Sequence, residues 1–174
     1  MIRRVFDKRF RTHWSSYVLQ SIFAAISVFL VLIALRQQNL VVAASLAATA
    51  FTIFAMPSSV TASTRNVILG HIIGLAFGSL FAIFLNGTAL MQDFMYAFAV
   101  GGAMLTMAIT NSEHPPAAGT ALGVVINGFS FRIVLGVIIG VLVLAIIHRL
   151  LRPILRDLVR PPEQANSDIT KSEE

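Results

Sequence analysis

Residues 66–85 read NVILGHIIGLAFGSLFAIFL, a stretch in which no side chain is charged. An α-helix needs about 20 apolar residues in a row to cross the hydrocarbon core of a bilayer. Two more stretches of similar character, 16–35 and 131–151, lie on either side of it in the sequence. The three stretches therefore predict an all-α polytopic membrane protein.

The composition of the whole chain supports this prediction. Hydrophobic residues make up 56% of the chain and charged residues only 12%, whereas a soluble domain carries about 25% charged residues. Neither end is long enough to build a soluble core. We therefore predict a basic N-terminus (1–13), one membrane domain (14–151) and a polar tail (152–174). Within the membrane domain, the charged residues are Arg36, Arg65, Asp93, Glu113, Arg132 and Arg149.

Three further apolar segments complete the domain, at 40–56, 94–110 and 117–127. The first two are close to the lower length limit for a membrane span, and the third is too short to cross unaided. The chain thus has about six apolar segments, of which four to six cross, and we favour six. The fifth segment is predicted to be a half-helix or to gain length from its flanks. Short or broken spans are typical of transport sites.

Basic residues predict the orientation of the chain. Lysine and arginine cluster before the first span and after the last, which places both termini in the cytoplasm. We expect a bacterial plasma (inner) membrane, with the 57–65 and 111–116 loops on the cytoplasmic side. The pI near 10.8 then reflects contact with lipid headgroups and not with nucleic acid. The absence of cysteine excludes disulfides and thiolate metal sites.

Glycines recur at a spacing of four residues, which brings them to one face of a helix. Small residues on one face let another helix approach closely, within the chain or between subunits. The alternative is a ridge that lines a narrow pathway. A small bundle of short helices also favours a homo-oligomer. The predicted packing residues are Gly70, Gly74, Gly78, Gly136 and Gly140.

Polar residues gather in two proline-containing breaks, 56–66 (MPSSVTASTRN) and 111–122 (NSEHPPAAGTAL). Each break follows a small-residue apolar segment and precedes another. This shared layout predicts a possible internal repeat of two segments each.

The motif Glu113-His114-Pro115-Pro116-Ala117-Ala118-Gly119-Thr120-Ala121-Leu122 resembles the HPP family of integral membrane proteins, over roughly residues 14–151. Met56-Pro57-Ser58-Ser59 and Arg65-Asn66-x-x-x-Gly70-His71 add to the resemblance. The family is described as transporters, and chloroplast and cyanobacterial members are associated with nitrite. The resemblance therefore implies a transporter or channel for a small inorganic anion, with nitrite the leading candidate. The first loop departs from the family pattern, because it lacks two of the prolines expected there.

The residues themselves are compatible with an anion site. Proline is favoured in the first turn of a helix, and a helix N-terminus attracts anions. We expect the backbone N–H groups after Pro116 to be open to a ligand, and Arg65 to offer a permanently charged fork. The predicted binding residues are Arg65, His114, Pro115, Pro116, Ala117, Ala118, Gly119 and Thr120, with Ser58, Ser59, Asn66, His71 and Glu113 as further candidates.

Each of these residues also has a structural interpretation. Arg65 can mark the cytoplasmic edge of its helix, His114 can brace the adjacent turn, and His71 can bond a neighbouring backbone. Glu113 can pair with Arg65, carry a proton, or be a solvated loop acid.

Sequence patterns of enzymes are missing from these loops. The chain has no H-E-x-x-H, no G-x-S-x-G and no P-loop. We therefore expect no catalytic residues, no metal and no cofactor. Two hypotheses compete with transport: an intramembrane metal- or Ser/His-dependent enzyme, and a membrane scaffold or assembly factor.

Overall fold

The computed structural model describes residues 8–35 and 40–159, and every regular element within them is helical. This confirms the predicted all-α fold. The predicted N-terminus (1–7 of it) and tail (from 160 onward) lie outside the described residues. The elements are α1 (Lys8–Leu35), α2 (Leu40–Ala55), η1 (Val60–Ala62), α3 (Thr64–Ile83), α4 (Ala89–Ile109), α5 (Pro116–Asn127), α6 (Phe131–Leu151) and η2 (Arg152–Ile154).

Three helices in the described part of the chain are long and apolar enough to cross a membrane, namely Thr12–Ile33, Thr64–Ile83 and Phe131–Ile154. Helices α2 and α5 are shorter but also apolar. Helix α5 has 12 residues, which gives it a length of about 18 Å against a hydrocarbon core of about 30 Å. The predicted half-helix is therefore correct, and Pro116 stands at its first position as expected.

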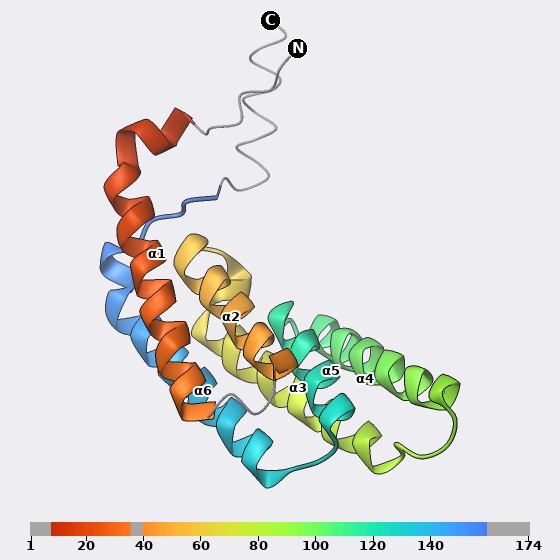
Figure 1. Ribbon diagram of the computed structural model, residues 1–174. Helices are drawn as coiled ribbons and strands as arrows, with labels where there is room; N and C mark the ends of the chain where they lie inside the picture. The colour runs from red at the N-terminus through yellow and green to blue at the C-terminus, as the bar shows by residue number, and fades with distance from the viewer. Residues whose placement is uncertain (1–7, 36–39, 160–174) are drawn as a thin grey trace, which may run out of the picture.

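The helices form a bundle with α1 and α6 paired along one flank and α4 along the other (Figure 1). Helices α2, α3 and α5 lie between them, and the contact of α3 with α5 is the most extensive in the bundle. Successive helices run in opposite directions, so residues 56–63, 110–115 and 155–159 come to the same end of the bundle. We call this end the loop face.

Helices α3 and α5 pack closely because glycines of α3 face α5. A Cβ atom on Gly74 would overlap the carbonyl oxygen of Ala117, and one on Gly70 would lie 2.7 Å from the Cβ of His114. Gly78 meets Ala121 in the same way, and Gly140 of α6 packs on Leu46. Gly136 is buried. The interpretation of the glycine stripe as a packing surface is thus supported within one chain.

A buried glutamine of α1 connects that helix to the end of α2 and to the segment after α6. The side-chain amide of Gln20 on α1 donates to the carbonyls of Phe54 and Arg156, the latter at 2.8 Å. Its Oε1 accepts from the N–H of Arg156 at 3.0 Å. The N–H of Leu158 donates to the carbonyl of Ala55 at 2.9 Å. Residues 155–159 therefore pack back onto α1 and α2.

Candidate functional site

The two proline-containing loops meet at the loop face, and Arg65 joins them. One guanidinium nitrogen of Arg65 donates to the carbonyl of Asn111 at 2.7 Å, and the other donates to the carbonyl of Thr110 at 3.2 Å. The side-chain amide of Asn66 donates to the carbonyl of Glu113 at 3.4 Å. Arg65 is exposed and Asn66 is buried. The predicted convergence of the 57–66 and 113–120 segments is therefore present in the structure.

His114 lies directly beneath this junction and is completely buried. Its Nδ1 donates to the carbonyl of Thr61 at 2.8 Å, because a carbonyl can only accept. Its Nε2 lies 3.0 Å from the hydroxyl of Thr49 on α2. The same hydroxyl lies 2.9 Å from Nε2 of His71 on α3. One threonine hydroxyl thus bridges the two imidazoles, whose ring centroids are 5.1 Å apart.

The contacts continue on the far side of His71. Its Nδ1 lies 2.8 Å from the hydroxyl of Thr120 on α5, which lies 2.7 Å from the hydroxyl of Ser45 on α2. Ser45 donates to the carbonyl of Pro116 at 2.6 Å. All five side chains are buried. We call the series from the Thr61 carbonyl through His114, Thr49, His71, Thr120 and Ser45 to the Pro116 carbonyl the buried polar chain.

Apolar groups surround this chain on the α6 side. A cavity of about 170 Å³ lies between α3 and α6, and His71 is the polar residue in its wall. The other lining residues are aliphatic, namely Ile68, Ile72, Leu75, Val137, Ile138, Val141 and Leu142. A buried polar group without a hydrogen bond is costly in such surroundings. Breaking any contact of the buried polar chain would therefore cost free energy.

The expectation of open amides at the start of α5 is wrong for its first two candidates. The N–H of Ala117 donates to the carbonyl of His114 at 2.9 Å, and that of Ala118 donates to the carbonyl of Pro115 at 3.1 Å. The backbone already turns before Pro116, because Pro115 has helical φ and ψ angles. This early turn supplies acceptors that a free helix end would lack. Gly119 faces Ser45 instead, since a Cβ atom added to Gly119 would lie 3.2 Å from the Cβ of Ser45.

The remaining predicted residues lie around the loop face. The Ser59 side chain caps η1 by accepting from the N–H of Ala62 at 3.2 Å, and its hydroxyl is 2.7 Å from that of Thr61. Glu113 is exposed, which fits its interpretation as a solvated acid. Arg65 donates to loop carbonyls and not to the Glu113 carboxylate. Pro115 is exposed as well.

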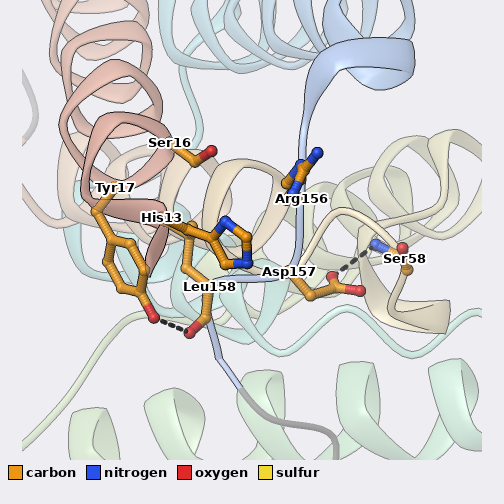
Figure 2. Close-up of a pocket in the computed structure, with 7 residues that line it drawn as sticks. All are labelled: His13, Ser16, Tyr17, Ser58, Arg156, Asp157 and Leu158. Atoms are coloured by element: carbon orange, nitrogen blue, oxygen red, sulfur yellow. Dashed lines mark hydrogen bonds between the residues drawn. The ribbon is translucent and has the colours of Figure 1, made fainter. Parts of the chain in front are cut away.

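Ser58 lies apart from the buried polar chain, in a polar cavity of about 370 Å³ at the loop face (Figure 2). Its N–H donates to the Asp157 carboxylate at 3.0 Å, and the Tyr17 hydroxyl donates to the carbonyl of Leu158 at 3.0 Å. The cavity joins α1, the first loop and the segment after α6. The other lining residues are His13, Ser16 and Arg156.

Sequence reasoning missed Ser45 and Thr49, the members of the buried polar chain that α2 contributes. Both lie in an apolar helix, where a hydroxyl commonly bonds the carbonyl one turn back. Thr49 has such a contact with Ser45 at 3.1 Å, and so does Thr52 with Ala48 at 3.0 Å. A sequence signal was nevertheless available, because Ser45, Thr49 and Thr52 follow helical spacing on one face of α2.

Within the described residues, no group of three or more His, Asp or Glu side chains is arranged to hold a metal ion. The two imidazoles of the buried polar chain use all four ring nitrogens on hydroxyl or carbonyl partners.

Comparisons with known proteins agree with this architecture. A family model described as the HPP transmembrane region matches residues 9–157. A transmembrane protein of Dictyostelium discoideum is 37% identical over 107 residues, which are 58% of this chain and 38% of that protein. Another from the same organism is 35% identical over 95 residues, or 55% and 30% of the two chains. The chain therefore spans well under half the length of these relatives. No solved structure matches it significantly.

Proposed function

This chain belongs to the HPP transmembrane family, and we propose that it is a transporter or channel for a small inorganic anion, with nitrite the leading candidate. The observation that carries the proposal is the buried polar chain, which lies directly under the junction of the two proline-containing loops. Polar and ionisable groups inside a membrane are costly and mark substrate or ion pathways. A catalytic role is not part of this proposal.

Arg65 provides the positive charge at the entrance. Its guanidinium has five N–H donors, and the contacts with Thr110, Asn111 and Asn66 use only part of them. An exposed cation raises the local concentration of anions at a pathway mouth. Beneath it, an Nε2–H group of His114 or His71 can donate to a small oxyanion once its contact with the Thr49 hydroxyl opens.

The proposal places the loop face in the cytoplasm. Arg149, Arg152 and Arg156 belong to this end of the bundle, and lysine and arginine favour the cytoplasmic side. Both termini are then cytoplasmic. The proposal includes contact with the lipid bilayer and a homo-oligomer, whose mass can be measured on the detergent-solubilised protein.

The test is uptake into liposomes that contain the purified protein, with nitrite, nitrate, chloride and formate compared. We expect nitrite to enter faster than into protein-free vesicles. Arg65→Ala should slow uptake, whereas Arg132→Ala, an exposed arginine at the other end of the bundle, should not. Uptake of none of the four anions would contradict the proposed function, and full uptake by Arg65→Ala would remove Arg65 from it.

A further inference from the structure

The buried polar chain contains fewer hydrogens than it has contacts. Six contacts connect its groups end to end, and carbonyl oxygens, which only accept, stand at both ends. Each contact needs one hydrogen between its two atoms. Two neutral imidazoles and three hydroxyls carry one hydrogen each, so five hydrogens serve six contacts. In the neutral state, therefore, two lone pairs must face each other at one position.

One added proton gives the buried polar chain six hydrogens for its six contacts. It also fixes which atom donates in each of the outer contacts. His114 Nδ1 donates to Thr61, Ser45 donates to Pro116, Thr120 donates to Ser45, and His71 Nδ1 donates to Thr120. The two Nε2 atoms and the Thr49 hydroxyl between them then hold the remaining hydrogens. With one imidazole doubly protonated, each of the six contacts has a hydrogen when the Thr49 hydrogen points to an Nε2 atom, at 2.9 or 3.0 Å, instead of to the Ser45 carbonyl at 3.1 Å.

Thr49 makes the added proton mobile between the two histidines. When His71 carries it, Nε2–H donates to the Thr49 oxygen, and the Thr49 O–H donates to His114 Nε2. Transfer breaks the His71 N–H bond, forms a new O–H bond on Thr49, and passes the original Thr49 hydrogen to His114. The charge moves from one ring to the other with no net change in the number of protons.

Within residues 8–35 and 40–159, no charged side chain next to the pair neutralises such a proton. The sequences of α2, η1 and α5 contain no acidic or basic side chain. Asp93 of α4, Arg132 and Arg149 of α6, Arg65 and Glu113 are exposed, and His148 of α6 is buried nearer the loop face end of its helix. A second proton on the pair is disfavoured, because two imidazolium rings 5.1 Å apart would repel each other away from water.

We propose that His71 and His114 share one exchangeable proton through Thr49 and that this proton accompanies each anion that the protein transports. The proposal rests on the proposed function, and it assigns the proton as the coupling ion. An anion that enters beside the pair compensates the imidazolium charge, which burial otherwise opposes. Loading of the proton and loading of the anion therefore favour each other, as coupled binding requires.

The shared proton is tested by NMR of the full chain with ¹⁵N-labelled histidine in lipid nanodiscs. Each ring is assigned by the loss of its signals in a His→Asn variant. With nitrite present to compensate the buried charge, we expect the two rings together to gain one proton as the pH falls from about 8 to 5, the range in which histidine ordinarily titrates. His114 should keep its Nδ1–H throughout. Two rings that each hold one hydrogen over the whole range would overturn the proposal.

Coupling is tested by initial rates of nitrite uptake with and without an imposed pH gradient, corrected for protein-free vesicles because undissociated nitrous acid crosses lipid alone. An acidic exterior should accelerate uptake by the wild type and by Thr49→Ser. Thr49→Val should lose this acceleration. Thr52→Val is the matched control, because the Thr52 hydroxyl bonds only the Ala48 carbonyl of its own helix among the contacts described.

The outcomes separate the two proposals. Uptake that follows the nitrite gradient but ignores the pH gradient would refute the coupling and leave anion transport intact. No uptake under any condition would refute both. If Thr49→Val does not fold, the wild type and Thr49→Ser still decide the question, since a wild type that ignores the pH gradient is sufficient to reject coupling.

Discussion

Arg65 combines two features at the loop face that substitutions can separate. Its planar fork reaches the carbonyls of Thr110 and Asn111 together, and its charged side chain is exposed. A lysine keeps the charge but is a compact point donor without the fork. The two variants Arg65→Lys and Arg65→Ala therefore distinguish bracing of the loop from attraction of the anion.

We expect Arg65→Lys to retain more nitrite uptake than Arg65→Ala at low ionic strength. The advantage should shrink as salt is added, because exposed charges are screened over about 10 Å at 0.1 M ionic strength. Initial uptake rates at a series of salt concentrations measure this. Equal rates for the two variants at all salt concentrations would show that the charge contributes nothing.

The sequence predicted part of the site at this scale. His71 and His114 stand out because they are ionisable residues beside apolar segments. Their bridging partner Thr49 does not stand out in the sequence, because a threonine in an apolar helix commonly bonds the carbonyl one turn back. In this helix that carbonyl belongs to Ser45. The bonding of the Ala117 and Ala118 amides also could not be predicted from the sequence. Whether the first N–H groups of a helix are free depends on the turn before it, and here that turn contains the fully buried His114.

The close contact of α3 with α5 positions His71 beside Thr120. Gly74 has no room for a side chain because the backbone of Ala117 lies against it, whereas a Cβ on Gly101 of α4 would meet nothing within 4 Å. The approximate helix positions could be predicted from the lengths of the apolar segments and from Pro116. The pairing of the helices could not be predicted, because all of them have apolar surfaces that can pack on one another or on lipid.

Gly74→Ala should lower the thermal stability of the protein in detergent, because α3 and α5 must move apart. Gly101→Ala should leave it unchanged or raise it, since alanine favours a helix over glycine by about 1 kcal/mol. Thermal unfolding followed by circular dichroism compares the pair. An unfolding temperature that is the same for Gly74→Ala and the wild type would contradict the close approach.

Gln20 connects α1, the end of α2 and the segment after α6. Gln20→Ala leaves buried backbone groups without partners, at a cost of about 1–3 kcal/mol. We expect faster hydrogen exchange at residues 155–159 in this variant. Gln92→Ala on α4, which is partly exposed, serves as the control. Unchanged exchange at 155–159 in Gln20→Ala would show that other contacts hold the segment.

For the whole molecule, the alternation of helix directions places Asn86 and Asn111 at opposite ends of the bundle. Both residues are exposed, and the chain has no cysteine, so single-cysteine variants need no altered background. We expect a membrane-impermeant thiol reagent to label Asn86→Cys in intact cells and Asn111→Cys only after the membrane is opened. Labelling of both from the same side would contradict alternating crossings.

Participation of the buried polar chain in an anion pathway can be measured by nitrite uptake into vesicles that contain wild type, His114→Asn or His148→Asn. His148 is a buried histidine of α6 whose ring nitrogens have no hydrogen-bond partner among the described residues, which makes it the matched control. We predict that His148→Asn transports like the wild type and that His114→Asn is slower by about tenfold, equivalent to one hydrogen bond of about 1.4 kcal/mol. Equal uptake by all three proteins would show that His114 takes no part in transport.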